Sequence, residues 1–183
     1  MNSVDTELSV WTIGHSTRPI DDFVAALQSF RIGALVDVRT YPGSRRYPQF
    51  NKPNLAASLA EVAVQYQHSP ELGGRRRANP DSLNMAWRNE MFRGYADHME
   101  SKEFGEGIDR LLGLATKTRT AVMCAEAVWW KCHRSLIADY LKARGVTVIH
   151  ILGEGKSEEH PFTSAARIIN GELSYRGVLD VSE

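Results

Sequence analysis

The chain has 183 residues, of which 43% are hydrophobic and 24% are charged, and its 22 basic residues balance its 22 acidic ones. This size and composition predict one globular domain and exclude a disordered chain. The neutral balance disfavours general nucleic-acid binding but leaves room for a local basic patch. Because no apolar run approaches the roughly 20 residues that span a bilayer, and the N-terminus lacks a signal-peptide pattern, we expect no membrane partner and a cytoplasmic location. Two cysteines are too few for a disulfide scaffold.

The first part of the chain has the pattern of a β-α-β unit. Short apolar, β-branched runs predict the strands, and Phe23, Leu27 and Phe30 recur at helical spacing between the first two strands. In chain order we expect a strand at residues 9–14, a loop and helix at 15–33 and a strand at 34–39. A loop at 40–52, a helix at 53–64 and a strand at 64–70 follow.

The second part opens with the longest irregular segment, ELGGRRRANPDSLN. After it we expect two helices at residues 85–99 and 103–117, a strand at 119–126, a helix at 133–145 and a strand at 146–151. Strands that alternate with helices favour right-handed crossovers and parallel pairing. The sequence therefore predicts an α/β fold with a mostly parallel sheet of about five strands and helices on both faces. This is a single domain over residues 1–183, and the pattern assigns no firm element to its tail, residues 152–183.

Polar residues follow almost every predicted strand. In an open parallel sheet, ligands bind outside the carboxyl ends of the strands, where loops converge and helix N-termini point at the ligand. The candidate binding residues are Gly14, His15, Ser16, Asp37, Arg39, Ser44, Arg45 and Arg134. The candidate catalytic residues are Cys124, Glu126, Cys132 and His133. Strand ends meet water in any case, so the convergence carries this prediction rather than any single residue.

The segment CAEAVWWKCHR holds both cysteines and joins a predicted strand end to a predicted helix start. A cation and a helix N-terminus both stabilise a thiolate, so either thiol could be reactive there. His133 could act as general base or cationic partner, Glu126 could orient it or transfer protons, and Arg134 could hold an anion. The spacing matches neither the Cys-x-x-Cys redox motif nor the tyrosine phosphatase loop. The alternative is that Cys124 is simply a small buried hydrophobe.

Four of these residues, His15, Cys124, Cys132 and His133, are also of types that bind zinc. Zinc ligands usually come in tight pairs, whereas the adjacent Cys132 and His133 would point in different directions at a helix start. We therefore expect no metal site.

Arginines in or beside loops form a second theme. They are Arg39, Arg45, Arg46, Arg75, Arg76, Arg77, Arg93 and Arg134. Guanidinium groups favour phosphates and carboxylates, and interleaved aromatic residues could add stacking to a nucleotide or a single-stranded nucleic acid. The alternative is a solvated GGRRR loop, with Arg39 and Arg93 held in salt bridges by Asp37 and Glu90.

Several motifs, in order from about Trp11 to about Ile151, resemble a known bacterial family, the domain of unknown function 488. These motifs are TIGHS, VDVRTYPGSRR, QFN, YQH before ELGG, FRGYADHM, MCAEAVWWKCHRSLIADYL and VIHI. The spacing in CAEAVWWKCHR is similar to the family's Cys-Ala-Glu and Cys-His-Arg pattern, and the candidate binding residues fit its other motifs. The resemblance implies a compact α/β fold with suspected active-site motifs, but no established reaction. Many members carry an acidic residue and a proline where this chain has AVWWK, which implies another branch and a different substrate.

These features favour an enzyme with a Cys/Glu/His/Arg site at the carboxyl edge of the sheet. Its substrate would be a phosphate- or carboxylate-bearing small molecule, such as a nucleotide. A first alternative is a noncatalytic nucleotide or nucleic-acid binding module with structural cysteines. A second is a thiol redox sensor, which requires Cys124 and Cys132 to lie within bridging distance. The motifs assign no reaction class, cofactor or oligomeric state.

Overall fold

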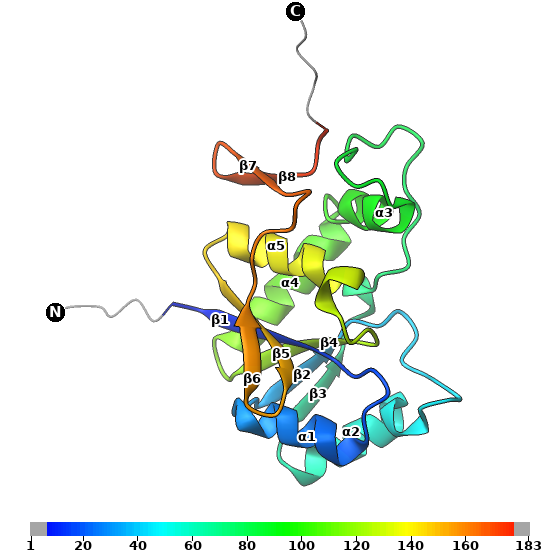
Figure 1. The fold of residues 1–183 in the computed structure, drawn as a ribbon, viewed down its shortest axis with the longest axis vertical. Coiled ribbons are helices and arrows are strands. Elements are labelled where there is room, and N and C mark those ends of the chain that lie inside the picture. The colour runs from blue at the N-terminus through cyan, green and yellow to red at the C-terminus, as the bar shows by residue number, and fades with distance from the viewer. Residues whose placement is uncertain (1–6, 178–183) are drawn as a thin grey trace, which may run out of the picture.

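The computed structural model describes residues 7–177, and a central sheet of six strands organises them (Figure 1). The strands are β1 (Ser9–Gly14), β2 (Ala34–Asp37), β3 (Gln65–His68), β4 (Thr120–Cys124), β5 (Thr147–Gly153) and β6 (Lys156–Glu159). Their order across the sheet is β3-β2-β4-β1-β5-β6, and only β6 runs antiparallel to its neighbour. Because β2, β4 and β1 are adjacent and parallel, their carboxyl ends lie together at one edge.

Helices cover both faces of this sheet (Figure 1). They are α1 (Ile20–Ser29), α2 (Lys52–Glu61), α3 (Glu90–His98), α4 (Lys102–Ala115) and α5 (Arg134–Ala143). The strand residues Trp11 and Ile13 pack with α1 and α2, whereas Val10 packs with α4 and α5 on the other face. Successive side chains of a strand point to opposite faces, so one strand serves two cores. The predicted α/β fold is confirmed. No helix within residues 7–177 is long and apolar enough to cross a membrane.

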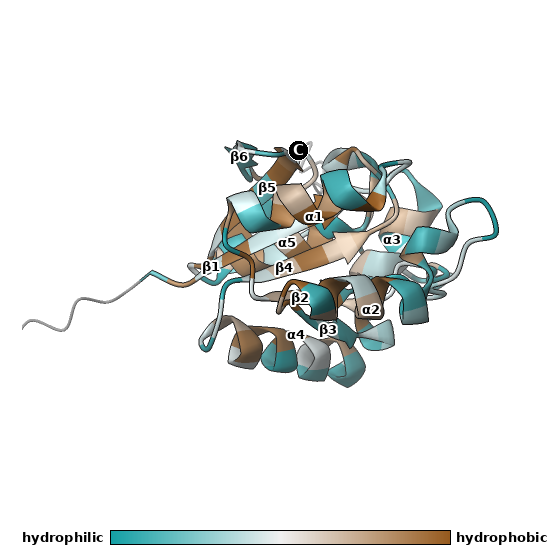
Figure 2. Ribbon diagram, turned by 90° about the horizontal axis from the view of Figure 1, so that it is seen from below, coloured by the Kyte–Doolittle hydropathy of each residue, from teal (hydrophilic) through white to brown (hydrophobic). Residues whose placement is uncertain are grey.

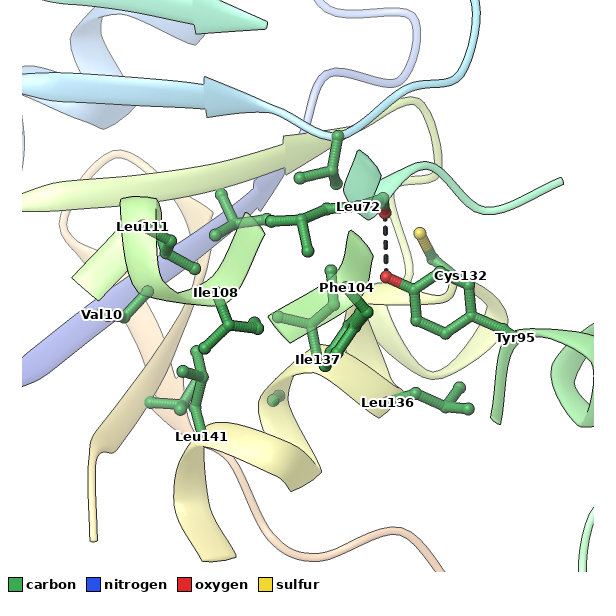
Figure 3. Close-up of a cluster of buried hydrophobic side chains, with 14 of the residues drawn as sticks. Val10, Leu72, Tyr95, Phe104, Ile108, Leu111, Cys132, Leu136, Ile137 and Leu141 are labelled. Carbon is green, nitrogen blue, oxygen red and sulfur yellow. Dashed lines mark hydrogen bonds between the residues drawn. The ribbon is translucent and has the colours of Figure 1, made fainter. Parts of the chain in front are cut away.

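Hydrophobic residues concentrate in the strands, and the helices carry both hydrophobic and hydrophilic residues (Figure 2). One of the two cores reaches the thiols of the chain (Figure 3). In this core, buried side chains of α4 and α5 pack together, and Cys132 belongs to the same cluster. The buried Tyr95 hydroxyl donates a hydrogen bond of 2.9 Å to the carbonyl oxygen of Leu72. The loop before α3 is thereby tied to this core.

The start of α3 differs from the prediction. The sequence pattern placed a helix from residue 85, but α3 begins at Glu90. Asn89 Oδ1 accepts hydrogen bonds from the backbone N–H groups of Met91 and Phe92, at 2.9 and 3.3 Å. An asparagine that caps the first turn in this way ends the preceding irregular segment, so the long loop extends further than expected.

The tail contains structure that the sequence pattern did not assign. β6 (Lys156–Glu159) is a fully exposed strand of charged and polar residues, so it has no apolar alternation to recognise, and it forms by pairing with β5. Farther on, β7 (Arg167–Ile169) and β8 (Glu172–Ser174) make a separate antiparallel pair. Short 3-10 helices lie within the loops: η1 (Pro48–Phe50), η2 (Pro70–Leu72) and η3 (Trp129–Lys131).

Candidate functional site

A pocket of about 750 Å³ opens at the carboxyl ends of β1, β2 and β4. Eight of the candidate residues line it: His15, Ser16, Arg39, Ser44, Cys124, Glu126, Cys132 and His133. A second cavity of about 740 Å³ lies between α3, α5 and the β7-β8 pair and is lined by none of the candidates. The strand-edge pocket therefore brings together the residues that the sequence singled out.

The two cysteines meet in the wall of this pocket. Cys124 ends β4 and Cys132 directly precedes α5, and the turn containing η3 folds the chain back between them. Their Sγ atoms lie 2.6 Å apart. The residues are only 2% and 4% exposed, although both line the pocket. Thiols in such contact meet the requirement for joining into a disulfide with little movement.

Cys132 has the surroundings of a thiol that ionises easily. The backbone N–H of Arg134 and the Nδ1 atom of His133 each lie 3.5 Å from its Sγ. Burial opposes ionisation, but the hydrogen bond with Cys124 and the charges of His133 and Arg134 outweigh it and hold the pKa of Cys132 well below its usual range. Burial, together with Cys132, raises the pKa of Cys124 well above its usual range. Of the two contacting thiols, Cys132 is therefore the one that loses its proton more readily.

The His133 ring is fixed from three sides. Its Nε2 donates to the carbonyl oxygen of Val38 at 3.1 Å, which leaves Nδ1 of the neutral ring able to accept the thiol proton. The Tyr95 ring packs against it with the centroids 5.0 Å apart. A Cβ atom on Gly74 would lie less than 3 Å from the ring, so only glycine fits there. The orienting role expected for Glu126 belongs to the Val38 carbonyl instead, since the Glu126 side chain is exposed.

A second polar cluster forms the opposite part of the pocket. Arg39 binds Asp37 through two hydrogen bonds, from Nε at 2.9 Å and from Nη2 at 2.7 Å, so the salt-bridge alternative for Arg39 is confirmed. The expected pair of Arg93 with Glu90 does not form, and Arg93 Nε donates instead to the carbonyl oxygen of Trp87 at 3.1 Å. Its Nη1 reaches His15 Nε2 at 3.3 Å, while His15 Nδ1 donates to the Ser16 carbonyl at 2.8 Å. Burial and the Arg39 charge lower the pKa of His15, although the Ser16 bond opposes them. The His15 ring is therefore neutral and stacks on Phe50.

The structure leaves four candidates outside the pocket lining: Gly14, Asp37, Arg45 and Arg134. Arg45 is exposed, and Asp37 acts through Arg39. Arg134 does not reach the pocket to hold a bound anion there, because its buried guanidinium donates to backbone carbonyls, including that of Glu126 at 2.7 Å. A Cβ on Gly14 would overlap the same Glu126 carbonyl, so glycine lets the loop after β4 cross β1.

Several groups that shape the pocket gave little or no sequence signal. Lys131 lines it beside Arg75, which the sequence had indicated among the loop arginines, and the Val38 carbonyl and Tyr95 hold His133. A backbone carbonyl leaves no trace in a sequence, whereas Gly74 was visible in the ELGG motif without a reason for it. Within residues 7–177, no group of three or more His, Cys, Asp or Glu side chains is arranged to hold a metal ion.

Fold and pocket define the class: an α/β protein with a contacting pair of buried thiols at the carboxyl edge of its sheet. The model of one family, the domain of unknown function DUF488, matches residues 19–141, which is more than half of the chain. The chain belongs to this family, as its motifs indicated. No curated protein and no solved structure matches it.

Proposed function

We propose that this protein is a thiol-dependent enzyme that reduces or exchanges a small anionic disulfide in the strand-edge pocket. The observation that carries the proposal is the 2.6 Å contact between a low-pKa thiol and a second thiol. A nucleophilic thiolate beside a resolving thiol is the arrangement that thiol-disulfide exchange requires.

The reaction has two steps. The Cys132 thiolate attacks one sulfur of the substrate, which breaks the substrate S–S bond, forms a mixed disulfide at Cys132 and releases a thiolate. That leaving thiolate takes the proton of Cys124. The Cys124 thiolate then attacks Cys132 Sγ, forms the internal disulfide and releases the second substrate half, which is protonated by His133 or water. A dithiol reductant or two thiol molecules restore the starting pair by the reverse exchange.

The charges that line the pocket favour an anionic substrate. Arg39, Arg75 and Lys131 are cationic, and Glu126 is the acidic residue of the lining. Asp37 offsets Arg39, so Lys131 and Arg75 carry most of the attraction. Guanidinium and ammonium groups bind carboxylates and phosphates through charge-assisted hydrogen bonds. Glu126 could transfer protons at the rim, as the sequence suggested.

The test uses glutathione disulfide, which carries carboxylates, and hydroxyethyl disulfide, which is neutral. Intact-protein mass spectrometry should show the loss of two hydrogen atoms in the parent protein and a trapped mixed disulfide in Cys124→Ser. Cys132→Ser should not react in its place. The anionic disulfide should react faster than the neutral one, and this preference should shrink in Lys131→Gln. Two inert thiols in the reduced, folded protein would contradict the proposal.

A thiol redox sensor is a second candidate, because the same contact would let peroxide join the cysteines without any substrate. Turnover separates the two: an enzyme passes electrons from a thiol reductant to many substrate molecules, whereas a sensor reacts once per oxidation.

The noncatalytic binding module stays a prediction. Two arginine-aromatic pairs with exposed arginines favour it, Arg46 over Tyr47 and Arg75 over Tyr41, each 5.5 Å from cation to ring centroid.

A further inference from the structure

The backbone of a buried arginine, Arg134, lies beside the thiol pair, and its guanidinium shares the carbonyl oxygen of Glu126 with the Cys124 thiol, at 2.7 and 3.7 Å. Arg134 is 1% exposed, and its backbone N–H is the group that points at Cys132 Sγ. Within residues 7–177, no ion pair joins it to a carboxylate. A cation taken out of water without a counter-charge costs several kcal/mol, so its retention calls for a physical reason.

The Arg134 guanidinium is held by neutral oxygen atoms. Nη2 donates to the carbonyl oxygens of Glu126 and Ala127, at 2.7 and 3.4 Å. Nη1 donates to Thr12 Oγ1 at 3.1 Å, and Nε has no hydrogen-bond partner among residues 7–177. These bonds secure the loop that follows Cys124, but they leave the positive charge itself uncompensated.

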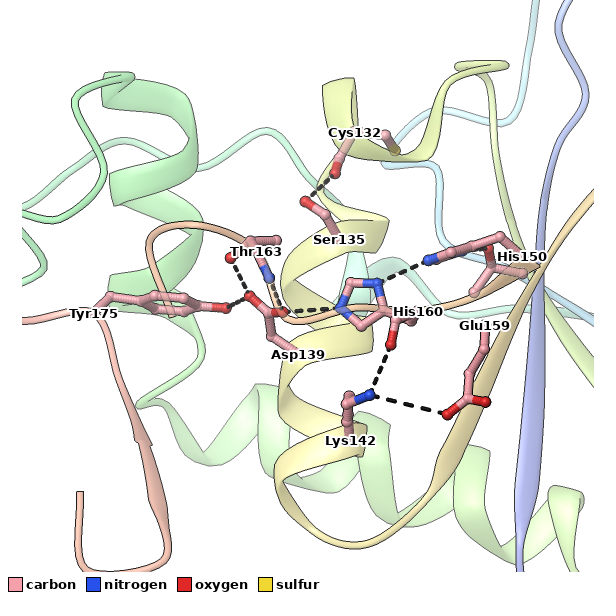
Figure 4. A network of polar contacts seen from close by, with 10 residues as sticks. Cys132, Ser135, Asp139, Lys142, His150, Glu159, His160, Thr163 and Tyr175 are labelled. Atoms are coloured by element: carbon pink, nitrogen blue, oxygen red, sulfur yellow. Dashed lines mark hydrogen bonds and ion pairs between the residues drawn. The ribbon is translucent and has the colours of Figure 1, made fainter. Parts of the chain in front are cut away.

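A chain of buried polar groups runs from Thr12 through His150 and His160 to Asp139, and Figure 4 shows its part from His150 to Asp139. His150 Nδ1 lies 2.6 Å from Thr12 Oγ1, His150 Nε2 lies 2.8 Å from His160 Nδ1, and His160 Nε2 lies 2.9 Å from Asp139 Oδ1. A carboxylate only accepts, so His160 Nε2 donates to Asp139. A guanidinium only donates, so the Thr12 oxygen accepts from Arg134 Nη1, and its other contact is with His150.

The groups around this chain of polar residues hold its side chains in place and keep His150 neutral. Tyr175 and Thr163 donate to Asp139 Oδ2 at 2.7 and 2.6 Å, and the Trp129 ring stacks on His150 with the centroids 4.4 Å apart. Burial, with the charges of His160 and Arg134, lowers the pKa of His150 to about 2, so that ring stays neutral. The mobile positive charge of a protonated His150 is therefore absent, and Arg134 is the fixed cation on this side of the thiols.

We propose that Arg134 is the counter-cation of the Cys132 thiolate, and that the chain from Thr12 to Asp139 positions its guanidinium. The inference rests on the proposed function, because it names the charge that makes the proposed nucleophile reactive. Arg134 does not line the pocket, so it is a positioning residue and not a substrate ligand. In turn the thiolate supplies the negative charge that the buried arginine lacks.

The test is the pH profile of Cys132 alkylation by iodoacetamide in a Cys124→Ser background, read by intact-protein mass spectrometry. Arg134→Gln should raise the apparent pKa of Cys132 by about 1 or more, which slows alkylation about tenfold at pH values below that pKa. Arg134→Lys should keep most of the parent reactivity, because it keeps the charge. An Arg134→Gln profile equal to the parent's, or an Arg134→Lys profile shifted as far as that of Arg134→Gln, would overturn the proposal.

A second pair of variants covers the case in which Arg134→Gln fails to fold. Thr12→Val removes the acceptor of Arg134 Nη1 with little change of shape. Like Arg134→Gln, it should raise the pKa of Cys132. Thr120→Val is the matched control, since Thr120 is a buried strand threonine that bonds only a nearby carbonyl. Equal profiles for the two variants would refute the positioning role of the chain. A parent Cys132 that reacts as slowly as an ordinary thiol at neutral pH would instead refute the proposed function.

Discussion

Replacing His133 with glutamine tests the electrostatics of the thiol pair most directly. When the ring carries the thiol proton, it places a positive charge 3.5 Å from the Cys132 sulfur. Opposite unit charges at this distance attract by about 4.7 kcal/mol at an effective dielectric constant of about 20, and by about 1.2 kcal/mol at about 80. Because about 1.4 kcal/mol corresponds to one pKa unit, His133→Gln should raise the pKa of Cys132 by about 1 to 3. Glutamine can still donate to the Val38 carbonyl, so the loop geometry is preserved.

The assay is again the rate of Cys132 alkylation against pH in a Cys124→Ser background, where serine keeps a hydrogen-bond donor beside the sulfur. His98→Gln is the matched control, because its Nε2 also donates to a backbone carbonyl, that of Glu71 at 2.7 Å. We expect the control to follow the parent profile. If His133→Gln also follows it, the imidazole does not stabilise the thiolate, and the assignment of Cys132 as the reactive thiol loses its basis.

Three further predictions concern stability and the shape of the site. Gly14→Ala should lower the free energy of unfolding by about 1–3 kcal/mol in urea titrations because of the overlap with a backbone carbonyl, whereas Gly105→Ala, in an open helix position, should be neutral or stabilising. Gly74→Ala should displace the His133 ring and slow alkylation of the thiol pair at neutral pH, and a fold-preserving variant with unchanged reactivity would show that the ring can move without effect. His150 has a pKa of about 2 when folded and about 6.5 when unfolded, so its contribution to stability is complete above pH 6.5 and is lost as the pH falls. By pH 5.5 this loss is about 1.4 kcal/mol; His150→Gln should flatten the decline, and an equally steep decline would argue against a neutral buried ring.

Part of the fold follows from local sequence alone. Strands β1, β2, β4 and β5 could be predicted because each is a short, mostly apolar run, as expected of strands that are covered on both faces. The edge strand β3 is more polar and less buried than these four. The edge strand β6 could not, because its four residues are all exposed and its only cause is the unpaired edge of β5. The start of α3 was missed for a related reason: the cap at Asn89 outweighed apolar residues that continue the helical spacing before it.

The candidate site, like the fold, could be predicted from the sequence only in part. The sequence by itself determined which residues follow the strand ends, and with them the pocket that holds Cys124, Cys132 and His133. Only the tertiary structure decided their roles, because a role depends on distances between segments far apart in the chain. The tertiary structure places the two sulfur atoms in contact, joins the His133 ring to the Val38 carbonyl by a hydrogen bond, and buries the Arg134 side chain away from the pocket. Sequence spacing says which side chains can meet, but burial and the available hydrogen-bond partners decide which charge each one keeps.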